Sequence, residues 1–234
     1  MKVTVINASG NVGKTTISRY LLAPRMNNAQ IITVDSTNLD GTEEEVLRGE
    51  HFGELQRAAA LLDDVVVDVG SSHSEEYLSL MQQYGDSHYD YDYFVIPTAG
   101  GNADPKKNRD TIKTLAMLSA VGVPPEKLRV VLNIVRAVDN PAKVFSGLFD
   151  YYDSARTFTL NPAATVHVND IYARLNGTTK TIEQIIADEN DYKEMMRAAA
   201  DMDERLRCHD ALALKRLAGV VTKELDTVFV ELFK

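Results

Sequence analysis

A glycine-rich segment near the N-terminus carries the residue types that hold a polyphosphate. It reads Gly10-Asn11-Val12-Gly13-Lys14-Thr15-Thr16. Glycines let a loop curl where a Cβ would collide with phosphate oxygens, and a helix after the loop points its positive end at the same oxygens. Lys14 would supply the charge for the β- and γ-phosphates, and the Thr15 hydroxyl would complete a Mg²⁺ shell. The segment predicts a nucleoside triphosphate site with Mg²⁺.

Two aspartates support this prediction from elsewhere in the chain. Asp35 follows the apolar run 31–34, and Asp68 lies near the end of the run 65–69. The carboxyl ends of parallel strands meet at one edge of a sheet, so both carboxylates would face Mg²⁺ or its waters there. The alternative is a chance Gly-Lys-Thr in an ordinary loop. An apolar strand before the motif and a helical stretch after it favour the phosphate site.

The elements that would position these residues alternate between strand and helix over about the first 135 residues. Helical patterns cover 15–22, which Pro24 should end, and 111–121. The expected strands are apolar on both faces, as in a parallel sheet covered by helices. They span residues 2–7, 31–35, 65–69, 93–97 and 130–135. This order predicts the α/β class: a doubly wound, mostly parallel sheet flanked by helices, with ligand at the carboxyl ends of the strands.

The rest of the chain carries a weaker pattern. Residues 166–168 could form a last short strand, and the order of residues 42–45 resembles a capping box that opens a helix. Two C-terminal helices are expected at 191–207 and 210–233, the second with an apolar stripe. Since no linker or repeat interrupts the sequence, we expect one domain, 1–234, with its core in 1–135 and a helical part at about 190–234.

Composition limits the partners and the cellular location that can be expected for this chain. The net charge of −9 disfavours broad attraction to nucleic acid, and a single cysteine, Cys208, excludes an internal disulfide. No signal peptide or run of 18 apolar residues is present, which predicts a cytoplasmic protein without a membrane span. The densest basic patch lies at 105–109 with Lys113. It fits either a solvated helix face or weak, indirect DNA association.

The loop and the two aspartates resemble those of the deviant-Walker branch of P-loop proteins, the ParA/MinD family of partition and positioning ATPases. That family carries Lys-Gly-Gly-x-x-Gly-Lys-Thr/Ser, and Asp68 matches its Walker B aspartate. Asn133 looks like the asparagine that reads the adenine edge in many members. The chain departs from the pattern at Ser9, where the family would have its signature lysine, and at Ala8, where it would have the opening glycine. It also departs at Thr37, where the family has a water-orienting carboxylate.

The resemblance implies a specific set of roles. Lys14 and Asp35 would be catalytic, and Thr15 with Asp68 would hold Mg²⁺, Asp68 through water. The nucleotide, ATP, would contact Gly10, Asn11, Val12, Gly13, Lys14, Thr15, Thr16 and Asn133. The likeness is strongest to the StbB-type plasmid stability proteins, which act in plasmid maintenance and conjugation. It implies a homodimer with nucleotide and a DNA-binding adaptor as partner.

Two other functions remain open from the sequence. Ser9 and Thr37 favour a nucleotide-binding scaffold that does not hydrolyse ATP, or does so very slowly without a partner. The same scaffold also serves ATP-dependent ligases that activate a carboxylate. That class needs further polar loops around a substrate, and the sequence shows no such constellation.

Overall fold

The computed structural model describes residues 1–34, 49–100, 105–178 and 180–234. Asp35, Thr37 and the helix start expected at 42–45 lie outside these residues. The chain divides into two compact units. We call residues 1–168 with 228–234 the sheet unit, and residues 169–227 the helical unit. The single domain expected from the sequence stays a prediction.

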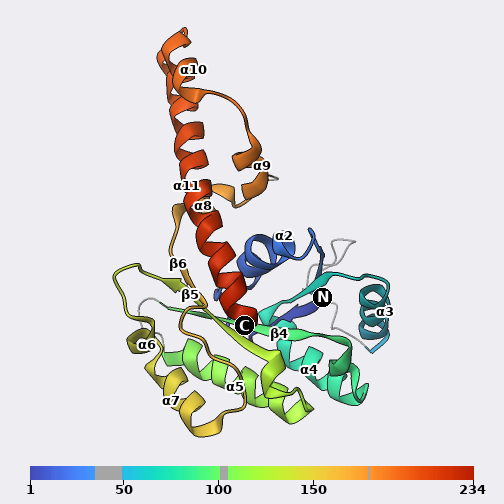
Figure 1. Cartoon of the computed structure of the whole chain (residues 1–234). Helices are drawn as coiled ribbons and strands as arrows, with labels where there is room; N and C mark the ends of the chain where they lie inside the picture. Colours follow the sequence, from blue (N-terminus) through green and yellow to red (C-terminus); the bar gives the residue numbers. More distant parts are fainter. Residues whose placement is uncertain (35–48, 101–104, 179) are drawn as a thin grey trace. The chain divides into compact units, whose positions relative to one another are not determined.

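Six strands form one sheet in the sheet unit, in the order β2-β3-β1-β4-β5-β6, and every neighbouring pair is parallel (Figure 1). The strands are β1 (Lys2–Val5), β2 (Gln30–Val34), β3 (Val65–Val69), β4 (Tyr93–Ala99), β5 (Leu128–Val135) and β6 (Thr165–His167). The doubly wound parallel sheet predicted from the sequence is confirmed, with strand ends shifted by one or two residues.

The burial of the strands explains why continuous apolar runs in the sequence predicted them. Every residue of β3 is buried, and so are all residues of β4 after Tyr93. Residues buried on both faces need no polar alternation, so each run stays continuously apolar. The core of this unit gathers around the sheet and includes Phe52, Tyr77 and Phe94, all fully buried.

Helices flank the sheet, with α4 and α5 side by side below it and α2 on the opposite side in Figure 1. The helix after the loop begins as α1 (Lys14–Thr16), continues as a π-helical segment (Ile17–Leu22) and ends as α2 (Ala23–Arg25), close to Pro24 as predicted. The other helices of this unit are α3 (Gly49–Ala60), α4 (Ser74–Gln83), α5 (Pro105–Val121), α6 (Pro141–Val144) and α7 (Ser146–Ala155). Short 3₁₀ turns occur at Ser71–His73, Ser87–Asp90 and Pro125–Lys127.

The helical unit contains α8 (Asp170–Leu175), α9 (Ile182–Ala187), α10 (Tyr192–Ala198) and most of α11 (Met202–Phe233), whose residues from Val228 onward belong to the sheet unit. The helix boundary predicted at residues 207–210 is wrong. The break lies before α11, where the Asp201 carboxylate accepts from the Glu204 backbone N–H at 2.7 Å. The Glu204 side chain accepts in turn from the Ala200 N–H at 2.8 Å. This cap starts the helix earlier than expected, so Asp210 lies within it on an exposed face.

In the described part of the chain, none of the helices combines the length and apolar character needed to cross a bilayer.

Candidate functional site

The glycine-rich loop connects β1 to α1 at the carboxyl edge of the sheet. Asn11 and Gly13 both adopt left-handed backbone conformations, with φ of 55° and 84°. At Gly13 a side chain is also excluded by space, because a Cβ there would lie 2.2 Å from the Asn133 Nδ2 atom. The curl of the loop therefore requires glycine at 13 for two independent reasons.

Lys14 is folded back onto the loop. Its Nζ donates to the carbonyl oxygens of Asn7 and Ser9, each at 3.0 Å, and the residue is only 9% exposed. A lysine at the start of this helix thus holds its ammonium inside the curve of the backbone. To bind a phosphate, the Lys14 ammonium would replace its hydrogen bonds to these carbonyl oxygens with hydrogen bonds to phosphate oxygens. A charged donor suits either kind of acceptor.

Asn7 fixes the start of the loop and was missed by the sequence reasoning as a functional residue. It is fully buried, and its Nδ2 donates to Pro97 O at 2.9 Å and to the Thr111 hydroxyl at 2.8 Å. Its Oδ1 accepts from the Ser9 backbone N–H at 2.8 Å. An asparagine at the end of an apolar strand, directly before a glycine loop, was the available signal.

Helix α5 supplies two further hydroxyls to this network. The Thr114 hydroxyl accepts from the Ala8 backbone N–H at 3.1 Å, and Thr111 contacts both Asn7 and the Thr98 hydroxyl. Residues three apart lie on one helix face, so Thr111 and Thr114 point together at the loop. The spacing was visible in the sequence, but only the sheet topology places α5 beside the loop.

Asn133 supports the loop from the end of β5. Its Nδ2 donates to Val12 O at 2.9 Å, and the residue is 3% exposed. The next residue, Ile134, has a φ of 56°, which is unusual for a β-branched residue, and the pairing of β5 with β6 shifts register between Leu132 and Val135. This irregularity turns Asn133 toward the loop backbone. The adenine-reading role expected for Asn133 stays a prediction, beside the loop-bracing contact that the structure shows.

The residues expected to hold Mg²⁺ lie on two elements at the same edge. Thr15 is exposed at the start of α1, and Asp68 is 2% exposed near the end of β3, paired in register with Val5. This arrangement fits a Mg²⁺ that binds the Thr15 hydroxyl directly and meets the buried Asp68 carboxylate through water. No group of three or more His, Cys, Asp or Glu side chains that could hold a metal occurs among the described residues. The ion would therefore need phosphate and water to complete its shell.

The accessible part of the loop faces solvent where a phosphate would bind. Gly10, Asn11 and Thr15 are exposed, whereas Val12 and Lys14 are buried. Among the described residues, a hypothetical Cβ on Gly10 would come nearest to Ser71 Oγ, at 3.8 Å, which is an ordinary van der Waals contact. The buried half of the loop is hydrogen-bonded to the sheet unit and the exposed half is available. The architecture and this loop place the chain in the P-loop α/β fold class.

Solved structures are similar to the chain over most of its length. Over 99% of this chain and 97% of the other, McdA from Cyanothece without ligand is similar, with a TM-score of 0.50 and 16% sequence identity. A plasmid partition protein from Borrelia burgdorferi bound to AMPPNP is similar over 92% of this chain and 98% of its own, with a TM-score of 0.47 and 12% identity. A McdA variant from Cyanothece with ATP covers 96% of each chain at a TM-score of 0.41 and 14% identity.

No protein-family model matches the sequence, and no curated protein matches it either. At 16% identity the similarity to McdA shows the fold alone. The fold that the sequence predicted, a parallel sheet flanked by helices, is confirmed.

Proposed function

We propose that this chain is a ParA-like protein that binds ATP with Mg²⁺ at the loop 10–16. The observation that carries the proposal is the conformation of the loop. A buried lysine lies inside a backbone curve whose outer half is exposed, and a helix begins at the end of the curve. A triphosphate requires a fixed cation and a helix N-terminus in such a curve, where backbone N–H groups of the loop could turn toward the phosphates.

Direct titration with a fluorescent ATP analogue and Mg²⁺ tests the proposal. Lys14→Ala removes a charged contact to phosphate worth about 1.5–3 kcal/mol, so affinity should fall by one to two orders of magnitude. Lys143→Ala is the matched control, because Lys143 is an exposed lysine of α6 in the same unit. Equal affinity of the wild type and Lys14→Ala would refute the assignment.

The setting of this activity is proposed from the family resemblance of the loop. The chain would act in plasmid partition, stability or conjugative transfer, as a nucleotide-dependent homodimer with a DNA-binding adaptor. Sedimentation of the purified protein with ATP, ADP and a non-hydrolysable analogue tests dimerisation. A protein that stays monomeric with all three nucleotides contradicts the dimer, while leaving the binding site intact.

A second candidate is a nucleotide-binding scaffold that does not turn over. Ser9 favours it, because this residue is 4% exposed and bonded on both sides, its N–H to Asn7 and its carbonyl to Lys14. Such a residue serves the loop's shape and offers no charge to a phosphate. Phosphate release with and without DNA separates this candidate from an ATPase.

A further inference from the structure

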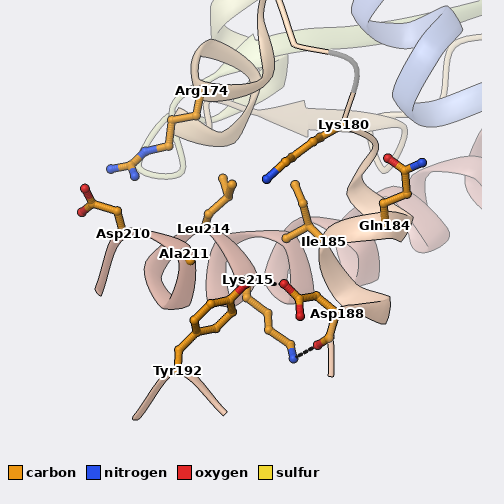
Figure 2. A pocket seen from close by; sticks show the side chains of 10 residues that line it. All are labelled: Arg174, Lys180, Gln184, Ile185, Asp188, Tyr192, Asp210, Ala211, Leu214 and Lys215. Atoms are coloured by element: carbon orange, nitrogen blue, oxygen red, sulfur yellow. Dashed lines mark hydrogen bonds between the residues drawn. The ribbon is translucent and has the colours of Figure 1, made fainter. Parts of the chain in front are cut away.

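The helical unit has a cavity of its own. The residues that line it are far in sequence from the glycine-rich loop. Its volume is about 510 Å³, within the range of sites for small organic ligands. Figure 2 shows its lining, which comes from four helices, α8, α9, α10 and α11, and from the segments beside them. All of the lining residues belong to the helical unit.

One part of the cavity is apolar. Ile185 of α9 is 8% exposed, and Ala211 and Leu214 of α11 are half-buried. In Figure 2 the side chains of Ile185 and Leu214 face each other across the space. Three residues of this kind provide a short apolar floor that a hydrocarbon chain or ring could cover.

The lining contains more positively than negatively charged side chains. Three cations, Arg174, Lys180 and Lys215, stand against two carboxylates, Asp188 and Asp210. Lys215 donates to the Asp188 backbone carbonyl. The pKa of the Asp188 carboxyl is lowered first by the Tyr192 hydroxyl and also by the Lys215 charge, so the charges of Lys215 and Asp188 offset each other. One positive charge is left in excess.

Arg174 and Lys180 differ from Lys215 in having no hydrogen bond or ion pair with any described residue. Figure 2 shows the Lys180 ammonium directed into the cavity, on the same side as Ile185 and Leu214. A cationic group beside an apolar floor matches a ligand that carries one negative charge on an apolar body.

We propose that this cavity binds a small amphipathic monoanion, an apolar chain or ring that ends in a carboxylate. The carboxylate would pair with Lys180, and the apolar body would lie on Ile185 and Leu214. The proposal goes beyond the nucleotide site and shares no residue with it. Loss of ATP binding in Lys14→Ala should therefore leave it unchanged.

Three ligands in titrations of the full chain test the two halves of the site. Octanoate carries both features, acetate carries only the carboxylate, and octylamine carries the same chain with the opposite charge. With ¹³C-labelled methyl groups, octanoate should shift the NMR signals of Ile185 and Leu214 saturably. Acetate and octylamine should shift them little at the same concentrations. Equal shifts by octylamine, or none by octanoate, would overturn the proposal.

Variants test whether Lys180 supplies the positive charge that binds octanoate. Lys180→Gln should weaken octanoate binding about fivefold, the scale of an exposed ion pair of about 1 kcal/mol. Arg207→Gln is the matched control: it removes one exposed cation from the same unit but not from the cavity lining. Both changes are at exposed positions, so the fold should persist, which the unchanged methyl spectrum without ligand would verify. An equal loss in Arg207→Gln would show general charge attraction and contradict the site.

Discussion

The polar groups of the two candidate sites are held in opposite ways. Around the glycine-rich loop, Asn7, Lys14 and Asn133 are each less than 10% exposed and bonded to the backbone of the sheet unit. Around the cavity of the helical unit, Arg174 and Lys180 are exposed. A buried polar group that loses its partner costs about 1–3 kcal/mol, whereas an exposed ion pair is worth at most about 1.

Because of this difference, substitutions in the two regions should have different effects on stability and on ligand binding. The loop is shaped before ligand arrives, so a change there should affect stability and binding together. The cavity cations keep their conformational freedom until a ligand binds, so a change there should affect binding alone and modestly. Substitutions can break or sharpen this contrast.

The largest expected effect concerns turnover, because a preformed loop can bind ATP without accelerating its hydrolysis. Positioning and charge stabilisation account for nearly all catalysis of phosphoryl transfer. Counted back from Lys14, the family's signature lysine falls six residues earlier, at Ala8 and not at Ser9, and Thr37 cannot act as a carboxylate base. Loss of a charge of this kind can cost about 10³–10⁵ in rate where arginine fingers have been measured. We therefore expect phosphate release far below about 1 s⁻¹ for the protein alone.

Phosphate release from the wild type and from Ala8→Lys would check this expectation. Ala8 is partly exposed, so a lysine there has room to extend. A wild-type rate of about 1 s⁻¹ or more, ordinary for an enzyme, would show that another residue orients the water. In that case the buried network of the loop supports chemistry as well as shape.

The next effect compares two glycines, one in each unit. Gly13→Ala should destabilise the protein by about 2–4 kcal/mol, because it adds the cost of a left-handed alanine to the loss of the Asn133–Val12 hydrogen bond. Gly219→Ala should instead stabilise by about 0.5–1 kcal/mol, since Gly219 lies inside α11 with nothing within 4 Å of its Cβ position. Chemical denaturation of both variants measures the difference. If Gly13→Ala unfolds at the wild-type denaturant concentration, the loop is not constrained as the structure shows.

The sequence predicted the strands and the loop because both depend on local rules. The runs that became β3 and β4 are apolar throughout, and Gly10 to Thr16 form a compact motif. The partners of the loop were not predictable in this way. Asn7 meets Thr111 across 104 positions, and Asn133 meets Val12 across 121. Such contacts follow from the strand order β3-β1-β4-β5, which the sequence alone does not determine.

The helical unit was predicted least well, for a different physical reason. The pattern predicts that the last helix starts at 210, but several aspartates in this region could cap a helix. Asp201 acts as the cap because Glu204 completes the arrangement from the third helical position. Single capping residues are weak signals, and the paired form is the stronger one.

A smaller effect should separate two roles of Asn133. Asn133→Ala removes the bond to Val12 O, and we expect ATP and GTP affinities to fall together by about fivefold, the scale of one hydrogen bond of about 1 kcal/mol. The adenine-reading role proposed from the family resemblance makes a different prediction, because an amide pairs with the N6/N7 edge of adenine and guanine offers two acceptors there. Parallel titrations with ATP and GTP decide between them. A selective loss of ATP affinity would support base reading and contradict a purely bracing role.

The smallest expected effect tests whether the hydrogen bond between Tyr192 and Asp188 in the helical unit persists in solution. The Tyr192 hydroxyl donates to Asp188, and this hydrogen bond is the main reason that the pKa of the Asp188 carboxyl lies below its usual value, ahead of the Asn190 backbone N–H and the Lys215 charge. A carboxyl with a lowered pKa in the folded state adds stability above its unfolded pKa and loses it as pH falls. Tyr192→Phe should therefore raise the pKa of Asp188 and remove a small stabilisation that is present at neutral pH and absent in strong acid. Carboxyl ¹³C titration by NMR measures the shift, with the other carboxyls of the same chain as internal references. An unchanged pKa of Asp188 would mean that the hydroxyl is seldom bonded in solution, because solvent competes for both partners of this part-buried contact. The contrast with the buried loop network would then be sharper than the structure alone shows.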